Sequence, residues 1–257
     1  KFFVKNSQDV FDLLDRLEKY AYTYAALSTP DDELWNTDKE LRNSIGILRL
    51  FKVTQWKPLI LVAEEKFSAQ DFKKLLNGIV ALSYRYNVVA KLQTNEMEKV
   101  YSKAAINLFS GSTKNITAVL NDLKALYVKD EDFKNYFAIK QFNTNNTTDK
   151  KLSRYTLYKL EGQESGGNLY DFETDAGTIE HILPESYPPI WQNEFTEEEY
   201  ERNVYMLGNL TLLESMKNNK LAGDKEFEEK KKVYSSSKFA ITKAIADPQW
   251  TPQNIKS

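Results

Sequence analysis

The C-terminal third of the chain contains residue types that could hydrolyse a phosphodiester. His181 is the single histidine among 257 residues, and it follows Glu180 in the run Ile-Glu-His-Ile-Leu-Pro. A histidine with an unperturbed pKa near ~6.5 can take a proton from water at neutral pH. Hydrolysis of the anionic diester also needs a Lewis acid, and carboxylate and amide oxygens suit Mg²⁺ or Mn²⁺. A lone histidine is more often structural, so its companions in the sequence decide between the two interpretations.

Two amide-containing segments follow the histidine. Asn209 lies in Leu-Gly-Asn-Leu-Thr-Leu-Leu, and Asn218 comes later, directly before Asn219 and Lys220. Taken singly, each asparagine is compatible with a turn, and Glu180 is compatible with an exposed strand residue. Taken together and in this order, the segments favour a nuclease site over unrelated structural residues.

The polar positions His181, Asn209 and Asn218 resemble the motif of HNH nucleases in order and spacing. Asparagine occupies the last position, where some members of that family carry histidine. The surrounding apolar motifs and the Phe…Lys…Tyr pattern at 227–234 resemble one subfamily more closely. It is the C-terminal nuclease-like domain of GmrSD-class, modification-dependent (type IV) restriction enzymes, and the resemblance covers about residues 152–257.

The resemblance implies a ββα-metal (HNH, or His-Me finger) module, in which two strands and a helix surround one divalent cation, Mg²⁺ or Mn²⁺. It implies catalytic roles for His181 and Asn209, with Asn209 holding the loop or the imidazole by hydrogen bonds. It implies metal ligation by Asn218 and by Glu180, a position where many HNH sites carry aspartate. The residues expected to contact the substrate phosphate are three lysines, Lys217, Lys220 and Lys230.

The same resemblance implies DNA as the substrate, modified cytosine as its recognition feature, and a role in restriction of phage. It also implies a preceding domain or subunit that hydrolyses nucleotides. This sequence contains no Gly-rich phosphate loop and starts without methionine, so we interpret it as a fragment of a longer protein. Two other functions stay open, namely a non-catalytic helical interaction module that retains the motif for structure and an RNA-directed HNH nuclease.

Charge and composition limit the function classes. The 35 lysines and arginines nearly balance 37 acidic residues, which argues against a highly basic DNA-coating protein but allows one local basic patch. The run Lys230-Lys231-Lys232 could follow DNA phosphates. Without cysteine, zinc–cysteine sites and thiol nucleophiles are excluded, and we expect a cytoplasmic protein. No run of about 18 apolar residues is present, so we expect no membrane span.

The elements that must position these residues follow from periodicity. Helical spacing of apolar residues dominates the first half, so we expect a mainly α protein that starts with a helical bundle. Capping patterns at Thr37 and Ser68 mark two helix starts. The apolar stripe that follows Ser68, with Leu75 and Ile79, indicates a core face and not a ligand site.

The polar, apolar-free run at 143–149 is the best candidate for a domain boundary. It divides the chain into a helical scaffold at 1–150 and a nuclease domain at 151–257. The helical spacing of apolar residues resumes after the run and is then replaced by short apolar runs. We therefore expect the second part to combine strands with flanking helices.

Short apolar runs at 178–183 and 209–213 predict two strands. Asp224 is expected to start a helix rich in lysine and glutamate. The order strand, loop, strand and helix would bring the histidine and the later asparagines to one place.

Overall fold

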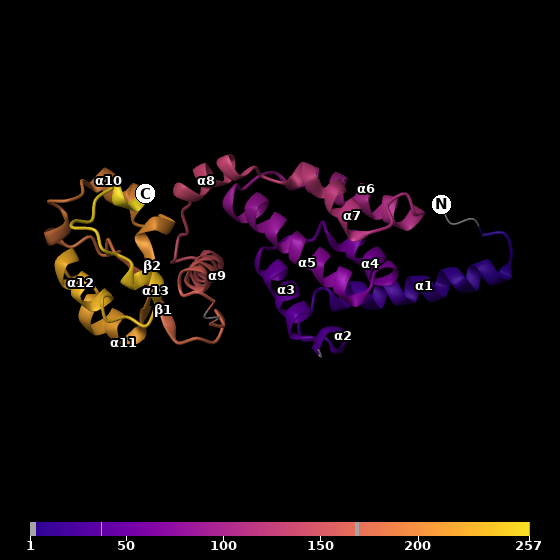
Figure 1. Cartoon of the computed structure of the whole chain (residues 1–257), viewed down its shortest axis with the longest axis horizontal. Helices are drawn as coiled ribbons and strands as arrows, with labels where there is room; N and C mark the ends of the chain where they lie inside the picture. Colours follow the sequence, from indigo (N-terminus) through magenta and orange to yellow (C-terminus); the bar gives the residue numbers. More distant parts are fainter. Residues whose placement is uncertain (1–3, 37, 168–169, 257) are drawn as a thin grey trace. The chain divides into compact units, whose positions relative to one another are not determined.

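The computed structural model describes residues 4–36, 38–167 and 170–256, and it is mainly helical with one small sheet (Figure 1). The mainly α class expected from the sequence is confirmed. The chain divides into two compact units, Lys1–Phe133 and Lys134–Ser257. In the described part of the chain, no helix combines the length and the apolar character that crossing a membrane requires.

The first unit is built from helices whose apolar faces pack on one another. They are α1 (Ser7–Ala26), α2 (Glu33–Asn36), α3 (Lys39–Leu50), α4 (Lys57–Lys66), α5 (Ala69–Ser83), α6 (Thr94–Ser110) and α7 (Ile116–Asp122). A π-helical segment, Tyr84–Val89, extends α5, and a 3₁₀ turn, Leu123–Leu126, extends α7. α4 packs against α6 and α3 against α5. The next helix, α8 (Asp130–Ala138), spans the division between the units.

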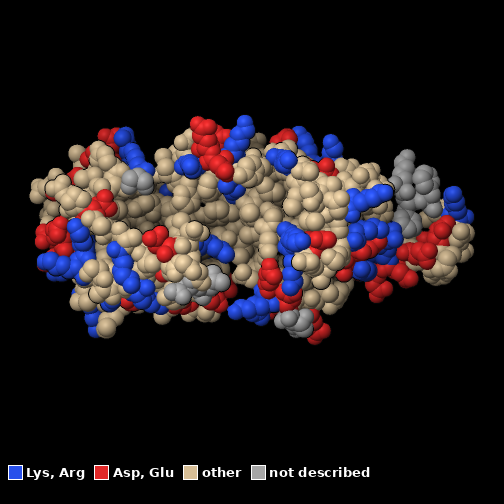
Figure 2. Space-filling model, in the orientation of Figure 1, with Lys and Arg blue, Asp and Glu red and all other residues tan. Residues whose placement is uncertain are grey.

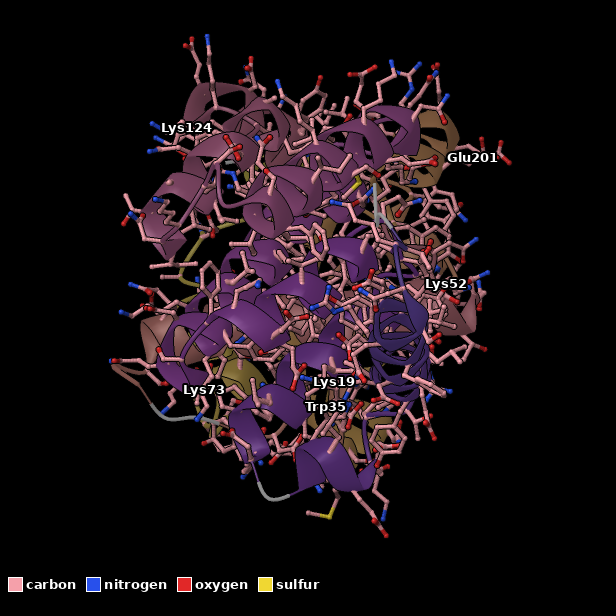
Figure 3. All side chains as sticks on the ribbon, turned by 90° about the vertical axis from the view of Figure 1, so that its right-hand side faces the viewer. Lys19, Trp35, Lys52, Lys73, Lys124 and Glu201 are labelled. Atoms are coloured by element: carbon pink, nitrogen blue, oxygen red, sulfur yellow. The ribbon has the colours of Figure 1, made fainter. Side chains whose placement is uncertain are left out.

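Side-chain caps explain where two of these helices begin. The hydroxyl of Ser68 accepts a hydrogen bond from a backbone N–H three residues later, at 3.2 Å, which confirms the predicted start of α5. Thr37 lies outside the described residues, and the carboxylate of Asp38 caps α3 instead. Lys73 of α5, labelled in Figure 3, pairs with that carboxylate at 2.5 Å. The ion pair joins the first turns of two packed helices.

The centre of the first unit is excluded from solvent. Leu75 and Ile79, from the predicted apolar stripe of α5, are both 0% exposed, so the stripe is a core face. Trp35 of α2, also labelled in Figure 3, stacks on Phe72 with ring centroids 6.3 Å apart. Its indole N–H donates to the carbonyl oxygen of Ala26, which satisfies the polar atom of a buried ring.

The second unit combines a two-stranded sheet with one long helix, drawn in salmon red in Figure 1, and several short helices in orange to yellow. Its helices are α9 (Thr147–Glu164), α10 (Glu197–Asn203), α11 (Ser215–Lys217), α12 (Phe227–Tyr234) and α13 (Ala240–Lys243). The helix predicted from Asp224 is α12, and it begins three residues later. The delay arises because the chain turns at Gly223, whose φ is +42°, before Glu226 takes the N-cap position.

The two predicted strands are confirmed, each shifted by one or two residues at its ends. β1 (Gly177–His181) and β2 (Leu210–Glu214) are antiparallel, and His181 lies opposite Leu210. After β2 the chain continues directly into α11 and then into a π-helical segment, Asn218–Ala222. The histidine is therefore the last residue of β1, and it pairs with the first residue of β2.

The polar run at 143–149 lies inside the second unit, so the division between compact units comes before the predicted boundary. Directly before the run, the chain pairs with the segment that leads into β2. The N–H of Phe142 donates to the carbonyl oxygen of Tyr205 at 2.9 Å, and the N–H of Leu207 donates to that of Lys140 at 2.7 Å. These bonds hold the residues directly before the run against the segment that leads into β2.

Gly208 of the Leu-Gly-Asn motif is required by a close approach of two backbone segments. A Cβ atom at this position would lie 1.9 Å from the carbonyl oxygen of Ile255, in the 3₁₀ turn Asn254–Lys256. No side chain fits in that space. Glycine therefore lets the C-terminal turn pack directly against the start of β2, next to Asn209.

Candidate active site

Asn209 joins the loop after β1 to the start of β2. Its Nδ2 donates to the carbonyl oxygens of Leu183 and Val204, both at 3.0 Å. Its Oδ1 accepts from the N–H of Leu183 at 2.7 Å and from the indole N–H of Trp250 at 3.0 Å. The residue is fully buried, and all four hydrogen-bonding capacities of its amide are used. Asn209 holds the backbone that follows His181, and no bond from it to the imidazole is found among the described residues.

Glu180 is the neighbour of His181 on β1, and its carboxylate is held by α12. Oε1 of Glu180 accepts from Nζ of Lys230 at 2.8 Å and from the hydroxyl of Tyr234 at 2.7 Å. Nζ of Lys230 also donates to the backbone carbonyl oxygen of His181, at 2.7 Å. The side chains of Glu180, Lys230 and Tyr234 are buried. The Phe…Lys…Tyr pattern of α12 therefore attaches this helix to the end of β1.

The expectation that Lys230 contacts a substrate phosphate does not hold in this structure. Its side chain is 0% exposed, and its ammonium group is surrounded by the carboxylate and carbonyl oxygens of β1. Burial raises the pKa of Glu180 and lowers the pKa of Lys230, while the attraction between the two charges opposes both shifts. The pair is an internal structural feature of the site.

The imidazole of His181 is almost enclosed. Nε2 lies 3.1 Å from Oγ1 of Thr144 and 3.7 Å from Oε1 of Glu185. Burial lowers the pKa of His181 to about 4; the carboxylate of Glu185 opposes this shift, and the ammonium groups of Lys230 and Lys150 add to it. At neutral pH the ring is uncharged and can accept a proton.

His181 borders an open cleft of about 470 Å³. The cleft is formed by the start of α9, by β1 and the loop after it, and by the π-helical segment and the turn that follows. The polar residues that line it and bear on its chemistry are Lys150, Glu180, His181, Glu185, Asn218 and Asp224. Three of the predicted site residues, His181, Glu180 and Asn218, therefore meet at one cleft.

Asn218 and Glu180 each have an oxygen that the described part of the protein does not use. Nδ2 of Asn218 donates to Oγ1 of Thr178 at 3.1 Å and to the carbonyl oxygen of Ile179 at 3.0 Å. Because a carbonyl oxygen can only accept, these bonds fix the amide orientation. Among the described residues, no hydrogen bond reaches Oδ1 of Asn218 or Oε2 of Glu180. Hard oxygens of this kind fit Mg²⁺ or Mn²⁺.

The described residues contain no group of three or more histidine, cysteine or acidic side chains placed to hold a metal ion. If Glu180 and Asn218 are the ligands of a cation at this cleft, they supply two protein oxygens. Mg²⁺ is commonly bound through one or two carboxylates and keeps several waters or substrate oxygens. The donor set therefore fits a cation that also binds substrate.

Three other lysines, Lys217, Lys220 and Lys150, differ in whether their ammonium groups are exposed and could contact a substrate phosphate. Lys217 pairs with Glu214 at 2.8 Å and donates to the carbonyl oxygen of Ser236, so it connects the end of β2 to the end of α12. Lys220 is exposed, and no ion pair involving it is found within the described ranges. Lys150 is likewise exposed and, unlike Lys220, lines the cleft. Of Lys150, Lys217 and Lys220, Lys150 is the one that lines the cleft with His181.

Sequence reasoning missed Thr144, Lys150 and Glu185. Glu185 follows His181 by four residues and comes directly after the Ile-Glu-His-Ile-Leu-Pro run, so its position gave a usable signal. Thr144 lies in the polar run assigned to a boundary, and no local pattern distinguishes it from its neighbours. Lys150 opens α9 without a motif of its own.

Comparison with known proteins adds one match. A family model described as the C-terminal domain of GmrSD restriction endonucleases matches residues 127–257. No curated protein and no solved structure matches the chain. The matched region contains the whole cleft and every residue that lines it.

Replacing Lys230 tests the buried ion pair. We expect Lys230→Met to reduce the free energy of unfolding by about 3–5 kcal/mol, because it leaves the Glu180 carboxylate buried without its partner charge. Lys232→Met, an exposed lysine on the same helix, is the matched control and should change stability by about 0.5 kcal/mol or less. Urea unfolding measures both. Equal effects of the two substitutions would show that the pair contributes nothing, and adding Glu180→Gln to Lys230→Met should recover part of the loss.

The pKa of His181 predicts a specific loss of stability in mild acid. Its folded-state pKa, about 4, lies below its ordinary value of 6.5. Between these values the unfolded chain binds more protons, so stability falls as the pH decreases. At pH 5 the wild type should have lost about 2 kcal/mol that His181→Gln does not lose. Thermal unfolding at pH 7 and pH 5 measures the difference, and parallel losses in both proteins would contradict the assignment.

Proposed function

The chain belongs to the GmrSD restriction endonuclease C-terminal domain family, and we propose that its second unit is an HNH-type, metal-dependent DNA endonuclease. The observation that carries the proposal is the setting of His181. Its imidazole, whose pKa burial lowers to about 4, borders a cleft together with Glu180 and Asn218, each of which has an oxygen that no hydrogen bond from the described residues reaches. An uncharged base beside two oxygen ligands is what metal-assisted hydrolysis of a phosphodiester requires.

In the proposed mechanism, His181 takes a proton from the attacking water. A positioned general base contributes about 10²–10⁴-fold to the rate of such a step. Glu180 and Asn218 would hold a divalent cation, which when bound would supply Lewis-acid stabilisation to the phosphate and the leaving oxygen. The hydrogen bonds from Lys230 and Tyr234 to Oε1 of Glu180 orient the carboxylate so that Oε2 remains for the cation.

Contact with the DNA backbone is assigned to Lys150 at the cleft and to the exposed Lys220. On the face shown in Figure 2, lysines and arginines gather over α11 and α12 but alternate with acidic residues. The balanced charge of the chain agrees with this mixture. DNA binding therefore depends on a few local phosphate contacts and not on a broad basic surface.

The wider role in the proposal comes from the family and from the motif resemblance. We assign the chain to phage restriction in the cytoplasm, with DNA modified at cytosine as substrate and a nucleotide-hydrolysing domain or subunit as partner. A non-catalytic interaction module is the alternative, and it predicts no cleavage under any condition.

Plasmid nicking tests the proposed activity. With Mg²⁺ or Mn²⁺, we expect the wild type to nick DNA and His181→Ala to be slower by about 10²–10⁴-fold, because the general base is lost. Asn218→Ala should require more metal for the same rate. Unmodified DNA, cytosine-modified DNA and RNA are compared in parallel, so that the substrate class is measured directly.

Glu201→Ala, an exposed position on α10 away from the cleft, is the matched control for these substitutions. Equal cutting by wild type and His181→Ala would show a contaminating nuclease and would remove the support for this site. Cleavage of RNA alone would replace the DNA assignment. No cleavage of any substrate by folded protein would favour the interaction module.

Lys150→Ala tests the phosphate contact. We expect weaker DNA binding, with a slope of log K against log salt that is smaller in magnitude by about 0.9, as for the loss of one phosphate contact. Lys159→Ala, an exposed lysine later on α9 that does not line the cleft, should leave the slope unchanged. Titrations over a range of salt concentrations measure both, and identical slopes for the two variants would contradict the contact.

A further inference from the structure

We infer that Thr144 and Glu185 are positioning residues that hold the imidazole of His181 in the tautomer with its hydrogen on Nε2. Nδ1 is then the ring atom that takes a proton from water. The catalytic meaning of this inference rests on the proposed nuclease function, whereas the tautomer itself does not. Neither residue occupies one of the three HNH motif positions, and Thr144 precedes the region that the sequence assigned to the nuclease.

The directions of two hydrogen bonds set the tautomer. The hydroxyl of Thr144 lies 3.1 Å from Nε2 of His181 and donates to Oε1 of Glu185 at 3.0 Å. A hydroxyl has one hydrogen, and an ionised carboxylate has none to give. The threonine hydrogen is committed to Glu185, so Nε2 must supply the hydrogen of the other bond. A neutral imidazole carries one N–H, and Nδ1 therefore bears the lone pair.

Tyr205 is a further neighbour of both His181 and Glu185. The hydroxyl of Tyr205 accepts a bond from Nδ2 of Asn145 at 2.6 Å, so its own hydrogen is directed away from that amide. Burial, and then the charge of Glu185, raise the pKa of Tyr205, so the phenol keeps this hydrogen at neutral pH. The same ring meets His181 edge-on, with centroids 6.1 Å apart. Tyr205 thus packs against the imidazole, and the hydroxyl of Thr144 donates to the Glu185 carboxylate.

The side chains of this network have little contact with solvent. Thr144 is 9% exposed and the side chain of His181 is 10% exposed. In such an environment the direction of a hydrogen bond persists, because water does not compete for the same groups. Among the described residues, no hydrogen bond reaches Nδ1 of His181. The unprotonated nitrogen is therefore the one left for water in the cleft.

The tautomer can be observed directly, because His181 is the only histidine. Labelling the full chain with [¹⁵N]histidine gives one imidazole, whose two nitrogen shifts distinguish Nε2–H from Nδ1–H. The wild type and Thr144→Ser, which keeps the hydroxyl, should both show Nε2–H. Glu185→Gln should populate Nδ1–H, because a glutamine amide can donate to Thr144 and let its hydroxyl donate to Nε2. Thr144→Val should also populate Nδ1–H, because Nε2–H loses its acceptor.

Nε2–H in the wild type does not decide the test by itself, because free imidazole side chains also favour this tautomer. The spectra of the variants decide it. Unchanged nitrogen shifts in both Glu185→Gln and Thr144→Val, with backbone spectra that show folded protein, would overturn the inference. So would Nδ1–H in the wild type. Appearance of Nδ1–H in the two variants and its absence in Thr144→Ser would support it.

Kinetics supply the second readout and separate the two proposals. Thr144→Val should lower kcat by about tenfold with KM unchanged, and Thr144→Ser should retain most of the rate. Equal kcat in all variants of an active nuclease would overturn the inference alone. A chain that cleaves nothing but shows the tautomer change would overturn the proposed function alone, because the spectroscopic experiment needs no substrate.

Discussion

The buried contact between the carboxylate of Glu180 and the ammonium of Lys230 is the interaction on which the site depends. It attaches α12 to the end of β1, and the same ammonium binds the backbone carbonyl oxygen of His181. Burying two charges is costly, and the hydroxyl of Tyr234 supplies a further bond that offsets part of the cost. The positive charge also helps to keep the nearby imidazole uncharged. One side chain therefore fixes the position of the base and adjusts its protonation.

The spacing of residues in α12 indicates that Lys230 is buried, although its positive charge suggests exposure to solvent. Phe227, Lys230 and Tyr234 recur at helical spacing, so they share one face of α12 and all three are buried. A Lys-Lys-Lys run could follow DNA phosphates, and this charge pattern, not the helical spacing, is the basis for expecting Lys230 at a phosphate. Periodicity placed the strands and the main helices correctly for the same reason, because those elements are defined by apolar residues at fixed local spacing.

The surroundings of His181 could not be predicted in this way. Thr144 and His181 are far apart in the sequence, and their contact depends on pairing between the backbone near Phe142 and that near Tyr205. A polar run without apolar side chains resembles a linker, because local composition does not show whether its ends are held. Asn209 is different, since the resemblance to HNH nucleases already implies a role for it in holding the loop or the imidazole.

The segment between Phe142 and α9 limits where residues can be inserted in the chain. Surface connections usually tolerate insertions, and a longer loop costs little in closure entropy. Here Phe142 is fixed by its bond to Tyr205, and Asn146 is fixed as the N-cap of α9, with Thr144 between them. An added residue would move the hydroxyl away from the imidazole while leaving the fold intact. Relatives that conserve the base should therefore keep the length of this polar segment even where its other residues differ.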